Sequence, residues 1–527
     1  ADAQVGLATT GSVPGNIVGY SLGMTALAIG VHVILRLRAP HADPVMLPTV
    51  VALNGIGLAM IYRLDYAYLQ RGSQAGFAPR QFLWTAIAVG MAVAVLWFLR
   101  DHRTLRRYTY TAMVTGLVLV ALPLLPGLGA TINGARIWIR FGSAVSFQPA
   151  ELGKIALAVF FAGYLVTNRD NLALAGPRFL RGHLPRGRDL GPILLAWAVS
   201  LGVLVFERDL GTSLLFFGLF VAMLYVATER LSWVLIGLGL FAVGAIAAAN
   251  LFPHVQARFD VWLHPLEPAI YNRSPGGSFQ VAQGLFGLGN GGLMGTGWGQ
   301  GYPHLVPFAN SDFIVTSLGE ELGLTGLLAI LSLYLVLAQR GVRTAIAVRD
   351  GFGKLLASGL AFVVAFQCFV VVGGVTRVIP LTGLTMPFLA YGGSSLLANW
   401  IILALLLVVA VLPVAAEEAG ERSVLAPLAG SSLLLDVAAK DGLAVAVGER
   451  GHVLVSRDQG RSWEQKQAPT QATLTAVYMH DGNLGWAVGH DAVILRTRDG
   501  GENWERVHYA PEEERPLLDV WFRDDAN

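Results

Sequence analysis

Apolar residues run in long, nearly unbroken stretches from about residue 15 to residue 413. Many of these stretches approach or exceed the roughly 20 residues that a helix needs to cross a bilayer. The pattern predicts an all-α polytopic membrane protein with about eleven transmembrane helices. The predicted spans are 15–35, 44–62, 82–99, 108–125, 150–167, 190–206, 210–227, 232–251, 313–338, 355–376 and 388–413.

One connection between predicted spans, residues 252–312, is much longer than the others. It is rich in glycine, proline and aromatic residues and carries little charge. A loop of this length inside a compact protein is usually functional rather than a simple linker. We therefore expect a folded cap over one face of the membrane domain (residues 1–413), with a site beneath it.

The pattern changes abruptly after the last predicted span, where residues 414–430 form a linker to a segment of alternating polar and apolar residues. Within residues 431–527, Ala446–Gly448 recurs as Ala487–Gly489 and Ser456–Trp463 recurs as Thr497–Trp504. A repeat near 40 residues built from short strands is typical of a β-propeller blade. The pattern predicts a short all-β fragment of two blades, and Leu518–Trp521 resembles the first strand of a third.

Each repeat contains an Asp-box, a short turn motif built from Asp, Gly and Trp. We interpret these residues as structural, because they stabilise the turn between two strands of a blade. They are Asp458, Gly460, Trp463, Asp499, Gly501 and Trp504.

Composition supports a membrane environment. The 527 residues are 54% hydrophobic and 14% charged, and the mean hydropathy is +0.56. Soluble domains carry about 25% charged residues.

The net charge of +2 gives no electrostatic field that would attract nucleic acid. The single cysteine excludes an intrachain disulfide and a cysteine-rich metal site, and the histidines show no metal-ligand spacing.

Basic residues fall unevenly on alternate loops. One set of loops carries Arg36, Arg38, Arg100, Arg103, Arg106, Arg107, Arg169, Arg178, Arg181, Arg186, Arg188, Arg230, Arg340, Arg343, Arg349 and Lys354; the other carries Arg63, Arg71, Arg80, Arg136, Arg140, Arg208, Arg258, Arg273 and Arg377. Cytoplasmic loops are enriched in lysine and arginine. The first set is therefore predicted to be cytoplasmic, which places the cap outside the cell. The first span lacks the charged leader of a cleavable signal peptide.

Charged residues inside apolar spans are the best candidates for chemistry, because each is costly at membrane depth unless it is paired or solvated. Glu151 and Lys154 lie three residues apart on one helical face. They line a polar cavity for a charged head group, or they form a structural pair that neutralises itself. Asp209 opens the next span, where it either caps the helix or faces the same cavity.

Asp312 lies where the cap meets the ninth predicted span. It either caps that helix or acts as a base, and helix-end amides are expected to keep it ionised. Glu320 and Glu321 follow two turns deeper and need a basic partner, for which Lys154 and Arg377 are candidates.

A glycine- and proline-rich break follows Arg377 and runs to Ser394 and Ser395. Broken helix at membrane depth is tolerated where it is buried in protein or lines a cavity. The Gly-Gly-Ser-Ser run also permits close helix packing. By contrast, Gly295–Gly301 lacks the Lys-Ser/Thr of a phosphate-binding loop.

Together these motifs resemble the SEDS family (shape, elongation, division and sporulation), which includes RodA and FtsW. The similarity covers about residues 44 to 407, looks closest to actinobacterial members, and implies that the chain begins partway through their amino-terminal extension. The matching segments, in the family's order, are Phe147–Lys154, Asp209–Ser213, Ser311–Ile314 with Gly319–Gly323, and Gly374–Phe388 running into Tyr391–Ser395.

The resemblance implies a multi-pass protein of the bacterial cytoplasmic membrane that polymerises lipid II into glycan strands on the outer face, for elongation or division. A class B penicillin-binding protein is the implied partner. The family's essential aspartate falls on Asp312, the implied proton acceptor, and Glu151 and Lys154 fall on cavity positions. From charge alone, Arg208 and Arg377 are candidates to hold the donor pyrophosphate. No cofactor is implied with certainty; a divalent cation is one possibility.

Two features depart from the family. The outer loop reads Trp262-Leu-His-Pro-Leu-Glu-Pro268, where the family has Asp-Pro pairs. Residues 431–527 resemble Asp-box propellers of the photosystem II assembly-factor type, and two blades cannot close a ring. Because Leu405–Ala416 also fits the end of a signal peptide, we hypothesise a fusion or truncated chimera. Alternative functions are a transporter (flippase) for lipid-linked precursors and a membrane scaffold whose propeller recruits partners.

Overall fold

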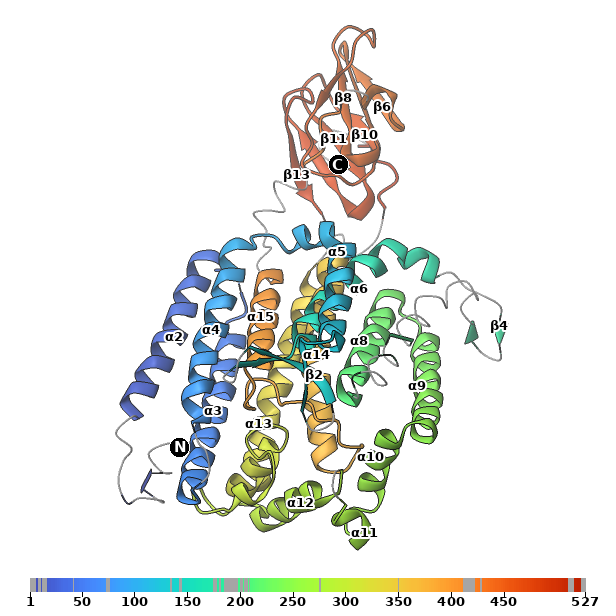
Figure 1. Ribbon diagram of the computed structural model, residues 1–527. Coiled ribbons are helices and arrows are strands. Elements are labelled where there is room, and N and C mark those ends of the chain that lie inside the picture. The colour runs from blue at the N-terminus through green and yellow to red at the C-terminus, as the bar shows by residue number, and fades with distance from the viewer. Residues whose placement is uncertain are drawn as a thin grey trace. The chain divides into compact units, whose positions relative to one another are not determined.

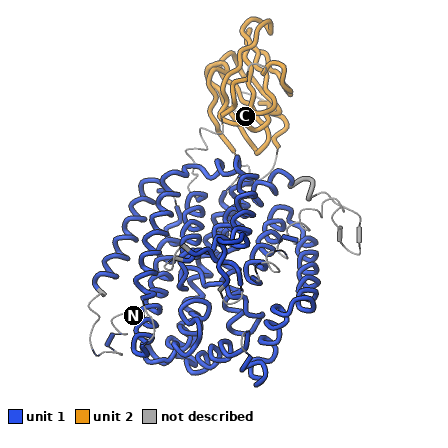
Figure 2. Tube along the Cα trace, viewed as in Figure 1, with its two compact units in different colours: residues 1–411 blue, residues 412–527 orange. Residues whose placement is uncertain are grey.

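The computed structural model divides into two compact units, residues 1–411 and 412–527 (Figure 2). The structure describes residues 6–7, 11 and 17–522, apart from 41, 73–75, 133–134, 142–144, 174–177, 180–181, 184–197, 200–201, 203–206, 208, 274–275, 349, 411–421, 427–428 and 510–515.

The first unit is a bundle of apolar helices (Figure 1). Within the described ranges, nine helical segments are long and apolar enough to cross a membrane. They are α2 (Ile17–Arg38), α3 (Met46–Gln70), α4 (Phe77–Phe98), η1 (His102–Tyr108) continuing into α5 (Thr109–Ala121) and η2 (Leu122–Leu124), α6 (Ala150–Ala173), α8 (Leu210–Thr228), α9 (Leu231–Leu251), α13 (Ile314–Ala347) and α14 (Gly351–Val375).

A shorter apolar helix, α15 (Gly393–Val409), corresponds to the last predicted span. The predicted all-α polytopic fold is therefore confirmed. The predicted span at 190–206 lies almost entirely outside the described residues.

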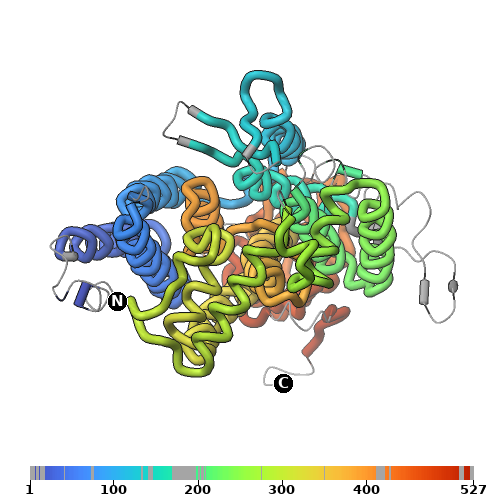
Figure 3. Tube along the Cα trace, turned by 60° about the horizontal axis from the view of Figure 1, so that its bottom comes forward, coloured from blue at the N-terminus to red at the C-terminus, as the bar shows by residue number. Residues whose placement is uncertain are grey.

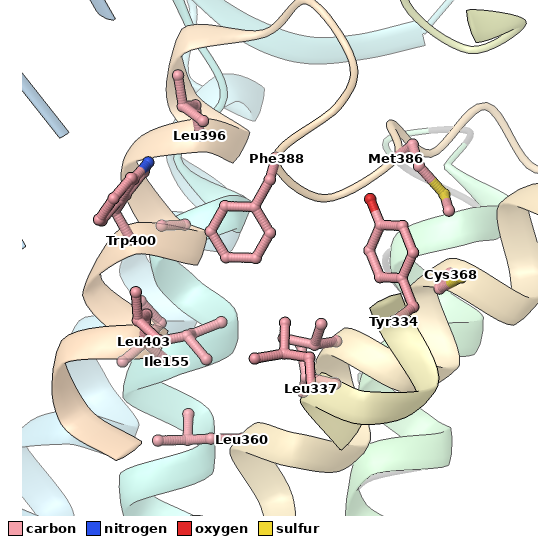
Figure 4. Packing of buried hydrophobic residues seen from close by; sticks show 14 of the residues in the cluster. Ile155, Tyr334, Leu337, Leu360, Cys368, Met386, Phe388, Leu396, Trp400 and Leu403 are labelled. Atoms are coloured by element: carbon pink, nitrogen blue, oxygen red, sulfur yellow. The ribbon is translucent and has the colours of Figure 1, made fainter. Parts of the chain in front are cut away.

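The second half of the break between α14 and α15, residues 384–390, is largely buried inside the bundle. Figure 4 shows Phe388 of this break facing Trp400 of α15; their rings meet edge-on, with centroids 6.3 Å apart. The hydroxyl of Tyr334 on α13 donates a hydrogen bond to the carbonyl oxygen of Pro387. Non-helical backbone at this depth is stable because neighbouring helices satisfy its polar groups.

The predicted cap is folded and helical. It contains α10 (Pro253–Leu263), α11 (Pro268–Tyr271), α12 (Phe279–Gly291) and η4 (Pro303–Leu305), which lie across one end of the bundle (Figures 1 and 3). Proline occupies the first turn of α10 and of α11, where its missing N–H would have no helical partner. Residues 262–268, where the sequence departs from the family's Asp-Pro pairs, thus form the connection between α10 and α11.

A three-stranded antiparallel sheet between α5 and α6 has no counterpart in the predictions. It consists of β1 (Gly129–Ile132), β2 (Ala135–Phe141) and β3 (Val145–Phe147). Strand β2 places Ile137, Ile139 and Phe141 on one face and Arg136, Trp138 and Arg140 on the other, which is the period of a half-buried strand. The backbone N–H of Arg136 donates to the carbonyl oxygen of Glu207 at 3.3 Å, which ties the sheet to the start of α8.

The second unit contains the two predicted blades, each a four-stranded antiparallel sheet. The first comprises β6 (Leu434–Lys440), β7 (Leu443–Gly448), β8 (Val453–Ser456) and β9 (Glu464–Lys466); the second comprises β10 (Leu474–Met479), β11 (Gly485–Gly489), β12 (Ile494–Thr497) and β13 (Trp504–His508).

The Asp-box residues stabilise turns, as predicted. Asp458 accepts hydrogen bonds from the backbone N–H and hydroxyl of Ser462, at 2.9 and 2.5 Å. Asp499 accepts from Asn503 in the same way, and the indole N–H of Trp504 donates to the Gly501 carbonyl. The predicted third-blade strand at Leu518–Trp521 is wrong: these residues form no strand, because no further sheet lies among the described residues to pair with them.

Candidate active site

Asp312 lies immediately before α13, where the cap joins the bundle, and its side chain is half-buried. Among the described residues no group donates a hydrogen bond to this carboxylate, so it does not cap α13. A Cβ added to Gly383, whose φ is +78°, would lie 3.8 Å from Asp312 Oδ2. The break after α14 therefore brings bare backbone close to the carboxylate and leaves room beside it.

Arg258 of cap helix α10 supplies the positive charge next to Asp312. Its guanidinium donates to the Leu381 carbonyl oxygen in the break, at 2.5 Å. Asp312 and Asp209 both act on it electrostatically and favour its charged form. Arg258 therefore links the cap, the break and two carboxylates.

Asp209 is the N-cap of α8. It accepts from the backbone N–H of Thr212 at 3.0 Å and from the Thr212 hydroxyl at 2.6 Å. The capping interpretation is therefore realised, and the same carboxylate also faces the site. A Cβ at Gly211 would lie only 2.5 Å from Leu384 Cγ, so glycine lets this turn pack directly on the break.

Burial raises the pKa of Asp312, the positive charge of Arg258 lowers it and the charge of Asp209 raises it, and the net result is a pKa of about 7. The expectation that helix-end amides keep Asp312 ionised is therefore wrong: no backbone amide lowers its pKa, and desolvation outweighs the nearby positive charge. A carboxyl with a pKa near neutrality is well matched to accept a proton at physiological pH.

Glu151 and Lys154 of α6 form a buried ion pair, with Lys154 Nζ 2.7 Å from Glu151 Oε2. Lys154 also donates to Gln367 Oε1 at 2.9 Å, and Gln367 donates to the Thr385 carbonyl oxygen at 2.9 Å. The Glu151 charge acts on Asp209 as well. The pair is thus structural and also continuous with the site. We call Glu151, Lys154, Asp209, Arg258 and Asp312 the charged cluster.

An apolar groove of about 930 Å³ adjoins the charged cluster. It is lined by α8, α9, α10, α14 and Ile379, Pro380 and Thr382; among the described lining residues the polar side chains are Ser213, Tyr225, Trp262 and Thr382. Three lining residues, Leu210, Phe259 and Thr382, directly follow or precede Asp209, Arg258 and Gly383 in sequence. One end of the groove therefore meets the charged cluster.

The adjacent carboxylates Glu320 and Glu321 lie apart from this cluster. Glu321 Oε1 accepts from Arg63 Nε of α3 at 2.9 Å, and Glu321 Oε2 accepts from the Gly299 backbone at 3.0 Å. Glu320 accepts from Asn290 at 3.1 Å and from the Tyr302 backbone at 2.9 Å. The suggested partners Lys154 and Arg377 are therefore wrong: the two glutamates fasten the loop after α12 to α13 and α3.

Arg377 also has a fastening role in this structure. Its guanidinium donates to the Trp262 carbonyl oxygen at 3.0 and 2.8 Å, and the Trp262 indole donates to the Arg377 carbonyl at 3.0 Å. These bonds hold the break against α10. Arg208, the other candidate for the pyrophosphate, lies outside the described residues.

Ser394 and Ser395 are buried in the first turn of α15. The Ser395 hydroxyl accepts from Asn399 at 3.2 Å. A Cβ at the neighbouring Gly393 would lie 2.2 Å from the Trp84 ring of α4. This run therefore serves the close packing of α15 on α4 rather than the charged cluster.

Sequence patterns did not single out Arg258 or Gln367. Gln367 was masked by its apolar surroundings, although a buried amide inside a span is itself a signal. Arg258 appeared only in the count of basic loop residues.

Across the described ranges, no three His, Cys, Asp or Glu side chains gather as metal ligands. The divalent cation stays a prediction.

These features define a polytopic membrane protein in which a lipid-sized apolar groove meets a charged cluster beneath an extramembrane cap. The chain belongs to the FtsW/RodA/SpoVE family: the sequence model of that family, described as a cell cycle protein, matches residues 44–412. The predicted SEDS membership is thereby confirmed. Residues 423–514 match the model for the photosynthesis system II assembly factor YCF48, as the Asp-boxes predicted.

Individual relatives support the same family membership. The peptidoglycan glycosyltransferase RodA of Mycobacterium tuberculosis is 50% identical over 396 residues, which are 75% of this chain and 83% of the relative. A probable peptidoglycan glycosyltransferase FtsW of a Geobacter species is 32% identical over 372 residues, 69% of this chain and 95% of the relative. The crystal structure of Thermus thermophilus RodA matches with a TM-score of 0.50 at 25% identity, covering 70% of this chain and 96% of that one.

Proposed function

We propose that this chain is a peptidoglycan glycosyltransferase that polymerises lipid II, with Asp312 as the proton acceptor. The observation that carries the proposal is the junction of the 930 Å³ apolar groove with the charged cluster. A polyprenyl-linked sugar has the matching layout, with an apolar chain joined through a diphosphate to a polar head. The names of the relatives support the same activity.

The reaction joins two sugars at the expense of a phosphate ester. The acceptor sugar's hydroxyl oxygen attacks the anomeric carbon of the donor, a new C–O bond forms, and the bond to the diphosphate oxygen breaks. Asp312 takes the hydroxyl proton, and the polyprenyl diphosphate leaves with the bonding electron pair. General-base assistance of this kind contributes typically ~10²–10⁴-fold in rate.

Arg258 has two tasks in this scheme. Its charge lowers the pKa of Asp312 against the effect of burial, and so increases the fraction of ionised base near neutral pH. It also lies at the end of the apolar groove, where charge accumulates on the departing diphosphate. Fixed positive charge at that position stabilises the transition state more than the ground state.

We place the reaction on the extracytoplasmic face of the membrane. The support is the distribution of basic residues: α13 runs from the cap side to an end that carries Arg340 and Arg343. Glycan strands are needed outside the cell, which agrees with that orientation. We further propose a class B penicillin-binding protein as the partner that crosslinks the strands.

Transport of lipid-linked precursors is the alternative activity. It would use the same groove and charges, but it requires no proton acceptor at the sugar. Purified full-length chain in vesicles containing fluorescently labelled lipid II separates the two. Formation of long glycan polymers supports the glycosyltransferase, whereas translocation of intact lipid II with no polymer under any partner condition would exclude it.

A further inference from the structure

A second cavity, of about 280 Å³, lies at the opposite end of the bundle from the cap. It is an open pocket between the carboxyl-terminal ends of α2 and α4, and α15 contributes Val408. Its lining consists of Leu37, Arg38, Ala39, Leu96, Leu99, Arg100 and Val408. Five apolar side chains and two guanidinium groups share this lining, which fits the junction between the anionic head group and the apolar chain of a ligand.

The two arginines are available for such a ligand. The guanidinium of Arg38 lies 3.8 Å from the centre of the Trp97 ring, which holds it at the rim. Within the described ranges no carboxylate pairs with Arg38 or Arg100. Because stacking on an aromatic face leaves the N–H edges of a guanidinium free, Arg38 can donate to phosphate oxygens, and so can the exposed Arg100.

The surroundings match the boundary between lipid tails and head groups. Leu37 is 67% exposed and Phe98 is 81% exposed, so apolar side chains beside the arginines face outward. Helix α2 buries little of its length against the rest of the protein. A lipid seated between α2 and α4 would add contacts to a helix that has few.

We propose that this cavity binds an anionic phospholipid of the cytoplasmic leaflet, with its phosphate held by Arg38 and Arg100 and an acyl chain against Leu37 and Leu96. The positive-inside distribution places both arginines in that leaflet, where anionic lipids attract basic residues. The site is separate from the charged cluster, so it does not depend on the glycosyltransferase assignment.

Native mass spectrometry of the purified full chain tests the proposal. The protein is released from phosphatidylcholine nanodiscs with or without phosphatidylglycerol, and retained lipids are counted. The double variant Arg38→Gln/Arg100→Gln should retain phosphatidylglycerol at least about tenfold less, because one lost charge-assisted hydrogen bond is worth ~1.5–3 kcal/mol. The matched control Arg36→Gln removes an exposed arginine from the same helical turn and should bind as the wild type does.

Two further samples make the result decisive. Arg38→Lys/Arg100→Lys keeps both charges and should recover most of the retention, which separates charge loss from misfolding. Inorganic phosphate, added to nanodiscs of phosphatidylcholine alone, should not raise the melting temperature. The proposal is overturned if the glutamine double variant retains phosphatidylglycerol like the wild type, if phosphatidylcholine is retained equally well, or if phosphate alone stabilises the protein.

Discussion

Arg258 donates a hydrogen bond to the carbonyl oxygen of Leu381, and this contact joins the cap to the break between α14 and α15. The same guanidinium interacts electrostatically with the carboxylates of Asp209 and Asp312. A residue of the cap thus partly offsets the rise in pKa that burial causes at a carboxylate just before α13. Movement of the cap would change the basicity of Asp312 without any change in the bundle.

The first prediction concerns pH. If the ionised form of Asp312 is the base, as proposed, kcat/KM should rise as pH increases through about 7 and level off above it. Arg258→Gln removes the charge that lowers the pKa, so the rising limb should move to higher pH, by about one pH unit or more. Asp209→Asn keeps the helix cap but removes the charge that raises the pKa, so the limb should move to lower pH.

The opposite signs of these two shifts form the internal control of the pH experiment. Arg273→Gln is the matched control for lost positive charge, because Arg273 pairs with Asp260 on the exposed side of the cap. Its profile should coincide with that of the wild type. Shifts of the same sign in both cluster variants would contradict the electrostatic arrangement.

The second prediction concerns the apolar groove. Ala245→Trp places an indole among the groove-lining residues of α9. Displacing two methylene groups of a lipid tail costs about 1.4–1.6 kcal/mol, so kcat/KM for lipid II should fall about tenfold. Ala247→Trp, on the exposed face of the same helix, should have little effect. With a short-tailed lipid II analogue the two variants should become indistinguishable; a persistent difference would mean that Ala245→Trp perturbs something other than tail binding.

The third prediction concerns Arg63 and Glu321, whose buried ion pair joins α3 to α13. Arg63→Met leaves Glu321 buried without its cation, which costs about 3–5 kcal/mol and should lower the melting temperature markedly. Removing both charges in Arg63→Met/Glu321→Met should be less damaging than the single change. Asp260→Asn, which breaks an exposed pair, should cost less than about 1 kcal/mol. Equal melting temperatures for Arg63→Met and Asp260→Asn would show that the buried pair contributes no more than a surface one.

The fourth prediction concerns the second unit. Deleting residues 423–527 should leave the polymerisation rate unchanged, because the groove and the charged cluster lie entirely within residues 1–411. Asp458→Ala, which removes the acceptor of the Ser462 bonds, should unfold the blades at lower temperature with the same lack of effect on polymerisation. Loss of polymerisation in the deletion would revive the scaffold hypothesis.

The long apolar stretches predicted the bundle well, because the bilayer requires helices of a fixed minimum length and allows few alternatives. Candidate residues at span ends were also recognisable: Glu151, Lys154, Asp209 and Asp312 are costly in lipid and so conspicuous. The β1–β3 sheet was missed because its strands are short and lie between two spans, where no long pattern can build up.

The pairing of the charges could not be predicted from sequence. Lys154 and Arg63 both lie in apolar spans, and only the packing of α3 against α13 decides that Arg63, rather than Lys154, reaches Glu321. The same holds for the pKa of Asp312, which depends on how deeply the cap buries it. Arg258 became visible as a site residue only once α10 was seen to lie against the break.

The most direct test of the account is polymerisation of labelled lipid II by Asp312→Asn, measured together with lipid II binding. Asp260→Asn serves as the matched control, because it neutralises a carboxylate of the cap that lies in an exposed pair. We predict that Asp312→Asn binds lipid II like the wild type but polymerises it at least about 100-fold more slowly, as expected for loss of a general base. Polymerisation by Asp312→Asn at the wild-type rate would contradict the central claim.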